Sequence, residues 1–341
     1  MSYRSSPFSI RLLEEDSVRA SASSLDKKQL TSLLPASYYT ESDDLAAASR
    51  NFVLCIEKEL DVRRLTKVFN WLWVAGRPSP PRPLHYQLLL GREILVTEQM
   101  DMHLVWTTDR IFLKPIPRFL LEPDFWDQYL CCGQICRCAA AARATEIPRC
   151  PLSTARKCAL GFLFSYVALI RHDSDFLMAK EKYLVPKEVQ WPGWVTFIEQ
   201  LDTEYIYPKI DPRFIYGELR LSRLNKIYFL SQRPFLRGYM SQWHQYGSFF
   251  HDNFAWLASA IVYIAVVLAA MQVGLGTQYL ANNDAFQSVS YGLTILSILG
   301  PLVVVGLIFL VFCYAFVKNW IMTIVYKEKR FYDIGVELEV S

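Results

Sequence analysis

The chain has 341 residues, 52% of them hydrophobic, and a formal net charge of +3. A charge this small excludes strong electrostatic attraction to nucleic acid, and no basic run or RNA-binding signature is present. The first residues contain no apolar segment that resembles a secretory signal peptide. We therefore expect no nucleic-acid partner, and we expect membrane insertion to be directed by segments later in the chain.

Residues 1–41 are rich in serine and charged residues, a composition that predicts a disordered or variable segment. A cytosolic, α-rich α+β domain is expected over 42–215, which is long enough to bury a core of its own. Its clearest helix is predicted over Asp61–Ala75, where large apolar residues recur every three or four positions. Gly76 then ends this helix.

A proline-rich segment over 76–83 follows and should adopt a polyproline II conformation. Arg77, Pro80 and Pro83 match the spacing that SH3-type domains bind. A stiff linker has the same composition, and both interpretations stay open.

Short strands and helices are predicted in the rest of this domain. Segments that begin at Arg92, His103 and Arg110 have strand composition and predict a small antiparallel meander. Further helices are expected at three places: residues 124–130, 174–184 and 193–201. The apolar run Ala159–Ile170 is too short to cross a bilayer unaided, which favours a core helix over a third membrane element.

Six of the eight cysteines lie between Cys131 and Cys158. Cys132, Cys136 and Cys138 are the candidate metal ligands, because closely spaced thiolates bind zinc. No second pair follows at the spacing of a zinc site, and acylation or a loop of reduced thiols explains the cluster as well. We therefore expect no resident metal or cofactor.

Two charge-free apolar segments predict transmembrane helices at 253–275 and 291–317. Each is long enough to cross the hydrocarbon core of a bilayer, which takes about 20 helical residues. Basic residues lie before the first segment and after the second, whereas the loop over 276–290 has no Lys or Arg. The positive-inside rule therefore places the N-terminus and the tail over 318–341 in the cytosol, with the loop on the far side.

Two features of the predicted hairpin bear on its packing. Pro301 removes a backbone hydrogen bond, so a kink is expected in the second helix. Small residues recur at four-residue spacing in the first helix, as Ala265 and Ala269 do. Such spacing lets helices approach closely, either within the hairpin or between copies of the chain.

Residues 216–252 are predicted to form basic amphipathic helices next to the membrane. Arg220, Arg223 and Lys226 form a basic stripe beside the apolar face of this segment. Contact of these residues with anionic lipid is one interpretation. A helix that packs on the domain and exposes its basic residues to solvent is the other.

Three stretches of the sequence are distinctive: FNWLWVAGRPSPPRPLHYQLLLGREILV, GELRLSRLNKIYFLSQRPFLRGYM and MQVGLGTQYLANNDAFQSVSYGL. In these stretches the chain resembles a family of filamentous-fungal two-span membrane proteins of unknown function. The likeness covers most of residues 50–317. It implies a fungal source and two spans, and it supplies no activity, catalytic residue or ligand.

No motif of a common enzyme class is present: the chain lacks G-x-S-x-G, H-E-x-x-H, phosphate-loop and dinucleotide-binding patterns. A membrane-bound enzyme is therefore only a second alternative. The layout is similar to that of CorA-type magnesium channels, but their Gly-Met-Asn signature is absent and neither span holds an ionisable residue. We expect a membrane-anchored cytosolic domain with an interaction, scaffold or accessory role, an oligomeric CorA-like channel or transporter being the first alternative. Its expected partners are the lipid bilayer, other proteins or a second copy.

Overall fold

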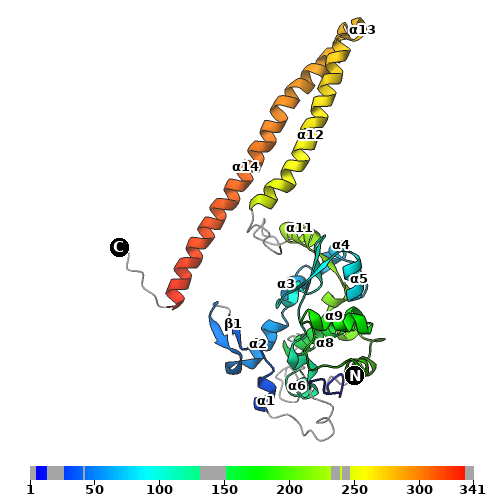
Figure 1. The fold of residues 1–341 in the computed structure, drawn as a ribbon. Helices are drawn as coiled ribbons and strands as arrows, with labels where there is room; N and C mark the ends of the chain where they lie inside the picture. The colour runs from blue at the N-terminus through cyan, green and yellow to red at the C-terminus, as the bar shows by residue number, and fades with distance from the viewer. Residues whose placement is uncertain are drawn as a thin grey trace, which may run out of the picture. The chain divides into compact units, whose positions relative to one another are not determined.

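The computed structural model describes residues 5–13, 27–40, 43–130, 151–231, 239 and 246–334. These residues belong to two compact units, Met1–Met240 and Ser241–Ser341 (Figure 1). The first unit combines helices with two small sheets, and the described part of the second is helical. A mixed α+β chain with two long apolar helices near its C-terminus is therefore confirmed.

The first unit starts with short elements that pack on its main core. They are α1 (Lys27–Thr31), β1 (Ser37–Tyr39), β2 (Leu45–Ala47), η1 (Ala48–Arg50) and α2 (Phe52–Glu59). Phe8, Leu12 and Leu30 are buried in that core, although the sequence predicted disorder over 1–41. The described parts of this segment differ from the prediction because a few large apolar side chains hold an otherwise polar stretch in place.

The helix predicted over Asp61–Ala75 is wrong as a single element. The segment forms three short helices: α3 (Arg63–Thr66), η2 (Phe69–Trp71) and α4 (Leu72–Ala75). Val68 and Trp71, which precede η2 and α4, have φ of −113° and −110°, outside the usual range of an α-helix. β-Branched and aromatic residues have low helix propensity, and they crowd this segment. The apolar spacing still identified the buried face, because Leu65 and Leu72 are fully buried.

The larger sheet has four strands in the order β3 (Glu93–Val96), β5 (Arg110–Leu113), β4 (Val105–Trp106) and β6 (Leu219–Arg220). β3 and β5 are parallel, β4 and β5 are antiparallel, and β4 and β6 are parallel. The predicted antiparallel meander is therefore wrong except for β4 and β5. The chain crosses to the far side of β5 through η3 (Met100–Met102) and Leu104, whose φ of 64° is left-handed.

The remaining helices of the first unit supply most of its core. They are α5 (Leu84–Leu89), η4 (Arg118–Leu121), α6 (Pro123–Tyr129), α8 (Pro151–Leu169), α9 (Asp173–Glu181), α10 (Trp191–Gln200), η6 (Tyr207–Lys209), η7 (Pro212–Ile215) and α11 (Leu221–Ser231). Phe162, Leu163 and Tyr166 of α8 are fully buried. The prediction of a core helix over Ala159–Ile170 is therefore confirmed.

The proline-rich segment 76–83 packs against the chain just before β6. The backbone N–H of Gly217 donates a hydrogen bond to Ser79 O at 2.9 Å. A side chain added at Gly217 would collide with the backbone of the proline segment, and one at Gly76 would collide with the backbone of Glu218. This close approach favours the stiff-linker interpretation, because one side of the segment is already covered.

Glu218 ties the end of that segment to the sheet. Its carboxylate accepts hydrogen bonds from Arg82 Nε at 2.8 Å and from Arg92 Nη1 at 2.8 Å. The side-chain amide of Gln87 donates a third at 2.9 Å. Burial alone would raise the pKa of Glu218, but these hydrogen bonds outweigh it and lower the pKa to about 2.

We expect Glu218→Gln to lower the free energy of unfolding at pH 7 by roughly 2–3 kcal/mol, because the folded-state pKa of about 2 lies well below the ordinary 4.5. This stabilisation is present above the unfolded-state pKa and is lost as the pH falls through the folded-state pKa. The difference between variant and wild type should therefore shrink as the pH falls from 4.5 toward about 2. Thermal unfolding in detergent, followed by tryptophan fluorescence, measures it. Glu93→Gln on β3, where the carboxylate is 65% exposed, is the control, and equal effects of the two changes at pH 7 would contradict the assignment.

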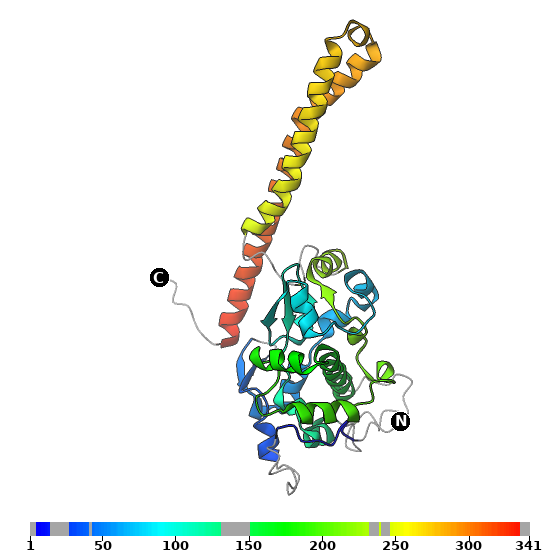
Figure 2. The same ribbon diagram turned by 45° about the vertical axis from the view of Figure 1, so that its right-hand side comes forward.

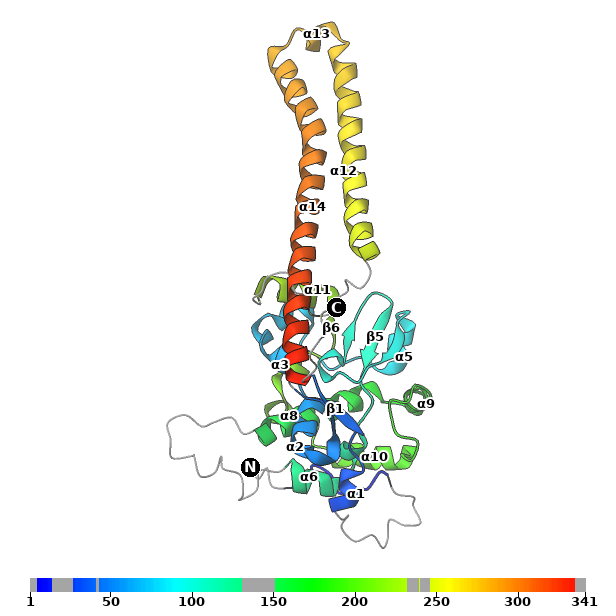
Figure 3. The same ribbon diagram turned by 90° about the vertical axis from the view of Figure 1, so that its left-hand side faces the viewer.

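The second unit contains α12 (Tyr246–Leu275), α13 (Gln278–Ala281) and α14 (Asp284–Ile334). α12 and the first part of α14 run side by side and are joined at α13 (Figures 2 and 3). α14 is longer than the predicted second span, because it begins in the predicted loop and continues into the predicted tail. Pro301 lies inside it, and the kink expected there stays a prediction.

The contact between α12 and α14 uses half-buried residues spaced three or four positions apart. On α12 these are Ile264, Val267, Leu268, Met271 and Gly274, and on α14 they include Phe286, Leu293, Ser297, Gly300 and Val304. Ala265 and Ala269 are exposed, so the hairpin does not use the small residues that the sequence singled out. Contact between copies through these two alanines stays a prediction.

Gly274→Val should destabilise the hairpin, because a Cβ at this position would lie 2.8 Å from Phe286 Cζ. Overpacking of this kind costs about 1–3 kcal/mol. Gly292→Val is the matched control, since no atom lies within 4 Å of the Cβ it adds. Thermostability of the full chain in detergent, measured by size-exclusion chromatography after heating, should fall for the first variant only. Equal midpoints of thermal denaturation for the two variants would contradict the contact between α12 and α14.

Candidate functional site

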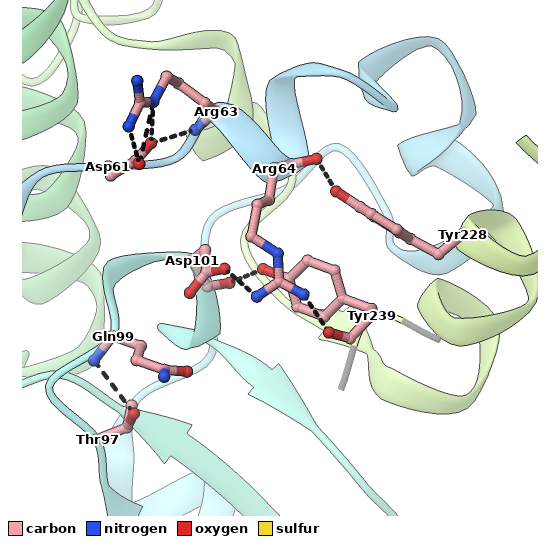
Figure 4. Close-up of polar contacts among 8 residues, drawn as sticks. All are labelled: Asp61, Arg63, Arg64, Thr97, Gln99, Asp101, Tyr228 and Tyr239. Carbon is pink, nitrogen blue, oxygen red and sulfur yellow. Dashed lines mark hydrogen bonds and ion pairs between the residues drawn. The ribbon is translucent and has the colours of Figure 1, made fainter. Parts of the chain in front are cut away.

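A cluster of charged and aromatic side chains gathers where distant segments of the first unit meet (Figure 4). Arg64 lies on α3, Asp101 on η3 and Tyr228 on α11. Tyr239 is the last residue that the structure describes before α12. We call these four residues the clasp.

An apolar cluster positions the clasp. Leu65 and Leu72 from the segment of short helices pack with Leu224 of α11 and Val105 of the sheet, and all four are fully buried. Tyr228 and Tyr239 belong to the same cluster. Because α3 and α11 share this apolar support, their polar side chains are brought to one place.

Arg64 makes the central contacts of the clasp. Its guanidinium donates to Asp101 Oδ2 at 2.8 Å and to the backbone carbonyl of Tyr239. The same guanidinium lies 4.3 Å from the centroid of the Tyr239 ring, which is a cation–π contact. The Tyr239 hydroxyl donates to the backbone carbonyl of Asp101 at 2.7 Å, and the Tyr228 hydroxyl donates to that of Arg64. Every member is thus held by directional contacts with another.

Burial sets the protonation states of the two tyrosines. It raises the pKa of Tyr239, and the neighbouring carboxylate of Asp101 raises it further. Burial likewise raises the pKa of Tyr228 to about 12. Both phenols therefore remain neutral hydrogen-bond donors near neutral pH, and neither is poised to exchange a proton. The clasp is built to hold a chain segment rather than to catalyse a reaction.

Tyr239 fixes the point at which the chain leaves the first unit. α12 begins at Tyr246, seven residues later. The clasp thus holds the chain at a residue that precedes the hairpin by only a short stretch of sequence.

A second polar cluster lies inside the core and contains a hydrogen-bonded Ser–His pair. His103 Nε2 lies 2.9 Å from Ser165 Oγ, and both side chains are buried. The backbone N–H of Lys114 donates to His103 Nδ1 at 3.1 Å, so Nε2 carries the proton. Ser165 in turn donates to Phe162 O at 2.6 Å. Burial holds the pKa of His103 well below its ordinary value, and in this tautomer the imidazole cannot take the serine proton. The pair is structural.

An open cavity of about 630 Å³ lies where residues 6–11 cross α6 and the end of α10. Gln200 Oε1 accepts hydrogen bonds from the backbone N–H groups of Ser9 and Ile10 at 2.7 and 3.2 Å. Arg11 forms an ion pair with Asp124 at 2.9 Å. These side chains hold residues 6–11 against the domain. The cavity is therefore a gap between packed segments of the chain.

The candidate metal ligands Cys132, Cys136 and Cys138 lie outside the described residues. Within the described ranges, no group of three or more His, Cys, Asp or Glu side chains is placed to hold a metal ion. Cys158, the last member of the cysteine cluster, is fully buried in α8, and burial raises its pKa well above the ordinary value. That thiol is therefore a core residue.

Arg220, Arg223 and Lys226 lie on two consecutive elements, and their contact with lipid stays a prediction. Arg220 lies on β6, with its guanidinium 5.3 Å from the centroid of the Trp106 ring. Arg223 and Lys226 are exposed on α11. The apolar face of α11 packs on the domain, so it is not available to enter a membrane.

An α+β unit followed by two helices that are long and apolar enough to cross a membrane defines the class of this protein. The chain belongs to a family of unknown function (DUF6601), which matches residues 52–301. The match begins at α2, spans the clasp and ends at Pro301. Comparisons with curated proteins and with solved structures gave no match.

The clasp predicts energetic coupling between Arg64 and Asp101. A double-mutant cycle with Arg64→Met and Asp101→Asn should give a coupling of about 1 kcal/mol in the free energy of unfolding, because the carboxylate is mostly buried and the guanidinium half exposed. The ion pair of Arg118 and Glu188 is the control, since its side chains are 49% and 40% exposed. Chemical unfolding of the full chain measures both cycles. A coupling for Arg64 and Asp101 no larger than that of the control would contradict a holding role.

Proposed function

We propose that this chain is a two-span membrane protein whose hairpin anchors the α+β unit to a bilayer, where the unit has an interaction, scaffold or accessory role. One observation carries the proposal. The windows Ala258–Leu275 and Asp284–Leu307 are long and apolar enough to cross a membrane, and 0% and 6% of their residues are buried within the protein.

The exposed side chains of these windows are large and apolar. Val262, Leu296 and Leu302 are 63%, 62% and 65% exposed. A contiguous apolar surface of this length is unstable in water, and a bilayer is the solvent that covers it on every side. The backbone of both segments is helical, which is one of the two conformations that satisfy every peptide group in lipid.

Two polar side chains of the second window, Thr294 and Ser297, fit an anchor better than a pore. The Thr294 hydroxyl donates to Ser290 O and the Ser297 hydroxyl donates to Thr294 O, both at 2.7 Å. These hydroxyls are satisfied by their own helix, and a conduction path requires polar groups that face water. This supports an anchor over the CorA-like channel that the layout also suggests.

The distribution of basic residues supports an orientation with both termini in the cytosol and residues 276–290 on the far side. The resemblance to filamentous-fungal proteins further suggests a fungal source.

Cysteine labelling in sealed vesicles tests the proposed topology. Asn283→Cys, which lies between α13 and α14, should react with a membrane-impermeant maleimide added from the non-cytosolic side. Ser5→Cys should stay protected until the vesicles are opened, and the wild type with its eight cysteines sets the background. Equal protection of both positions would contradict the two-span hairpin, and the reverse pattern would contradict its orientation.

A further inference from the structure

We propose that the exposed faces of α4 and α11, with the residues that flank α4, form a docking surface for an anionic lipid bilayer. The inference rests on the proposed membrane anchor. It adds that the α+β unit itself contacts the membrane surface, in addition to its covalent link to the membrane through the hairpin.

Large apolar side chains are exposed on this surface. Trp71 and Trp73 are 55% and 64% exposed, although Leu72 between them is fully buried. On α11, Phe229 and Leu230 are 43% and 73% exposed. Tryptophan is enriched at membrane–water interfaces, where its ring contacts apolar chains and its N–H contacts water. Two exposed tryptophans on one short segment are costly in water and favourable at a bilayer surface.

The two segments form one surface. α4 and α11 pack side by side in the first unit (Figure 1). Arg223 Nη1 donates to Val74 O at 3.1 Å, so its guanidinium reaches the residue next to Trp73. At the other end, the Tyr228 hydroxyl donates to Arg64 O. The apolar face of α11 is used for this packing, and its opposite face is therefore the one that can meet lipid.

That opposite face mixes cations with apolar groups. Arg223, Lys226, Phe229 and Leu230 are all exposed, and their spacing of three or four residues places them on one side of α11. Long basic side chains lie along a membrane surface with their charge at the phosphates, and the apolar side chains enter between the head groups. The composition matches an anionic bilayer better than bulk water.

Basic residues are concentrated in the two stretches of sequence that contribute to this surface, although Arg63 and Arg64 among them are ion-paired with Asp61 and Asp101. Residues 62–77 contain four basic side chains and residues 219–238 contain five, and neither stretch contains an Asp or Glu. The chain has 36 basic and 33 acidic residues in total, so outside these two stretches 27 basic residues face 33 acidic ones. A chain that is acidic elsewhere thus collects positive charge in these two stretches, and the second of them precedes the first apolar window in sequence. The complementary partner is a negatively charged lipid surface.

The clasp also links this surface to the first apolar window along the chain. Tyr239 is fixed to Arg64, beside α4, and α12 starts seven residues later. Covalent linkage to the proposed anchor raises the effective concentration of lipid at the surface. Weak contacts are sufficient for docking under this condition.

Quenching of tryptophan fluorescence by brominated lipid tests the proposal in the full chain. The protein is reconstituted into lipid nanodiscs that contain brominated phosphatidylcholine, either alone or with phosphatidylserine. We expect stronger quenching in the discs that contain phosphatidylserine. This increment should disappear at high salt, in Trp71→Phe/Trp73→Phe and in Arg223→Glu/Lys226→Glu. Lys182→Glu/Lys187→Glu is the matched control, because both lysines are exposed but lie outside this surface, and it should keep the increment.

The outcomes separate the docking surface from the anchor. Failure of the wild type to co-elute with the discs would contradict the anchor. Stable incorporation with the same quenching in both kinds of disc would overturn the docking surface and leave the anchor in place. An increment that survives in Trp71→Phe/Trp73→Phe would also overturn it. The tryptophans that approach the lipid would then be among the other seven of the nine in the chain.

Discussion

The apolar surface of α12 and α14 is the constraint on which the other features of this protein depend. Only 0% and 6% of the residues in the two apolar windows are buried by the protein itself, so the rest must be removed from water by something else. Each exposed apolar side chain costs on the order of 1 kcal/mol or more when it stays in water. Lipid covers such a surface without any need for shape complementarity. In the function proposed above, an α+β unit joined to this hairpin is therefore held at the bilayer.

The first unit is organised around the point at which the chain departs toward the hairpin. Glu218 and β6 attach the chain to the sheet. α11, which follows β6, packs on the short helices that follow Asp61. Tyr239 then closes this arrangement by contacts with Arg64 and Asp101. The joining segment is bonded to the first unit at its last described residue before α12.

The sequence predicted features that follow from composition over long stretches. Two segments of more than 20 apolar residues define the hairpin helices, and the 12-residue run Ala159–Ile170 correctly indicated a core helix. Sequence analysis failed to predict structure that depends on contacts between residues far apart in the chain. The parallel pairing of β3 with β5 depends on the path through Leu104. Phe8 is buried against Trp126 of α6 and Phe197 of α10, at 6.1 and 4.9 Å between ring centroids.

The candidate site was even less accessible to sequence analysis. Arg64 and Asp101 lie 37 residues apart, and the Tyr239 hydroxyl reaches back 138 residues to Asp101. No motif links these positions. The basic residues of α11 were visible as a pattern, but their setting was not. An amphipathic helix looks the same in sequence whether its apolar face packs on a domain or on a membrane, and the exposed partners Trp71 and Trp73 lie about 150 residues earlier.

Fractionation of membranes at alkaline pH tests the central claim most directly. The full chain and a variant that ends at Met240, the boundary of the first unit, are expressed in the same cells and the membranes are washed with carbonate. We expect the full chain to remain in the membrane pellet and the shorter variant to be released, because only the first contains α12 and α14. Release of the full chain by carbonate would contradict a membrane-spanning hairpin, and retention of the shorter variant would place the anchor in the α+β unit instead.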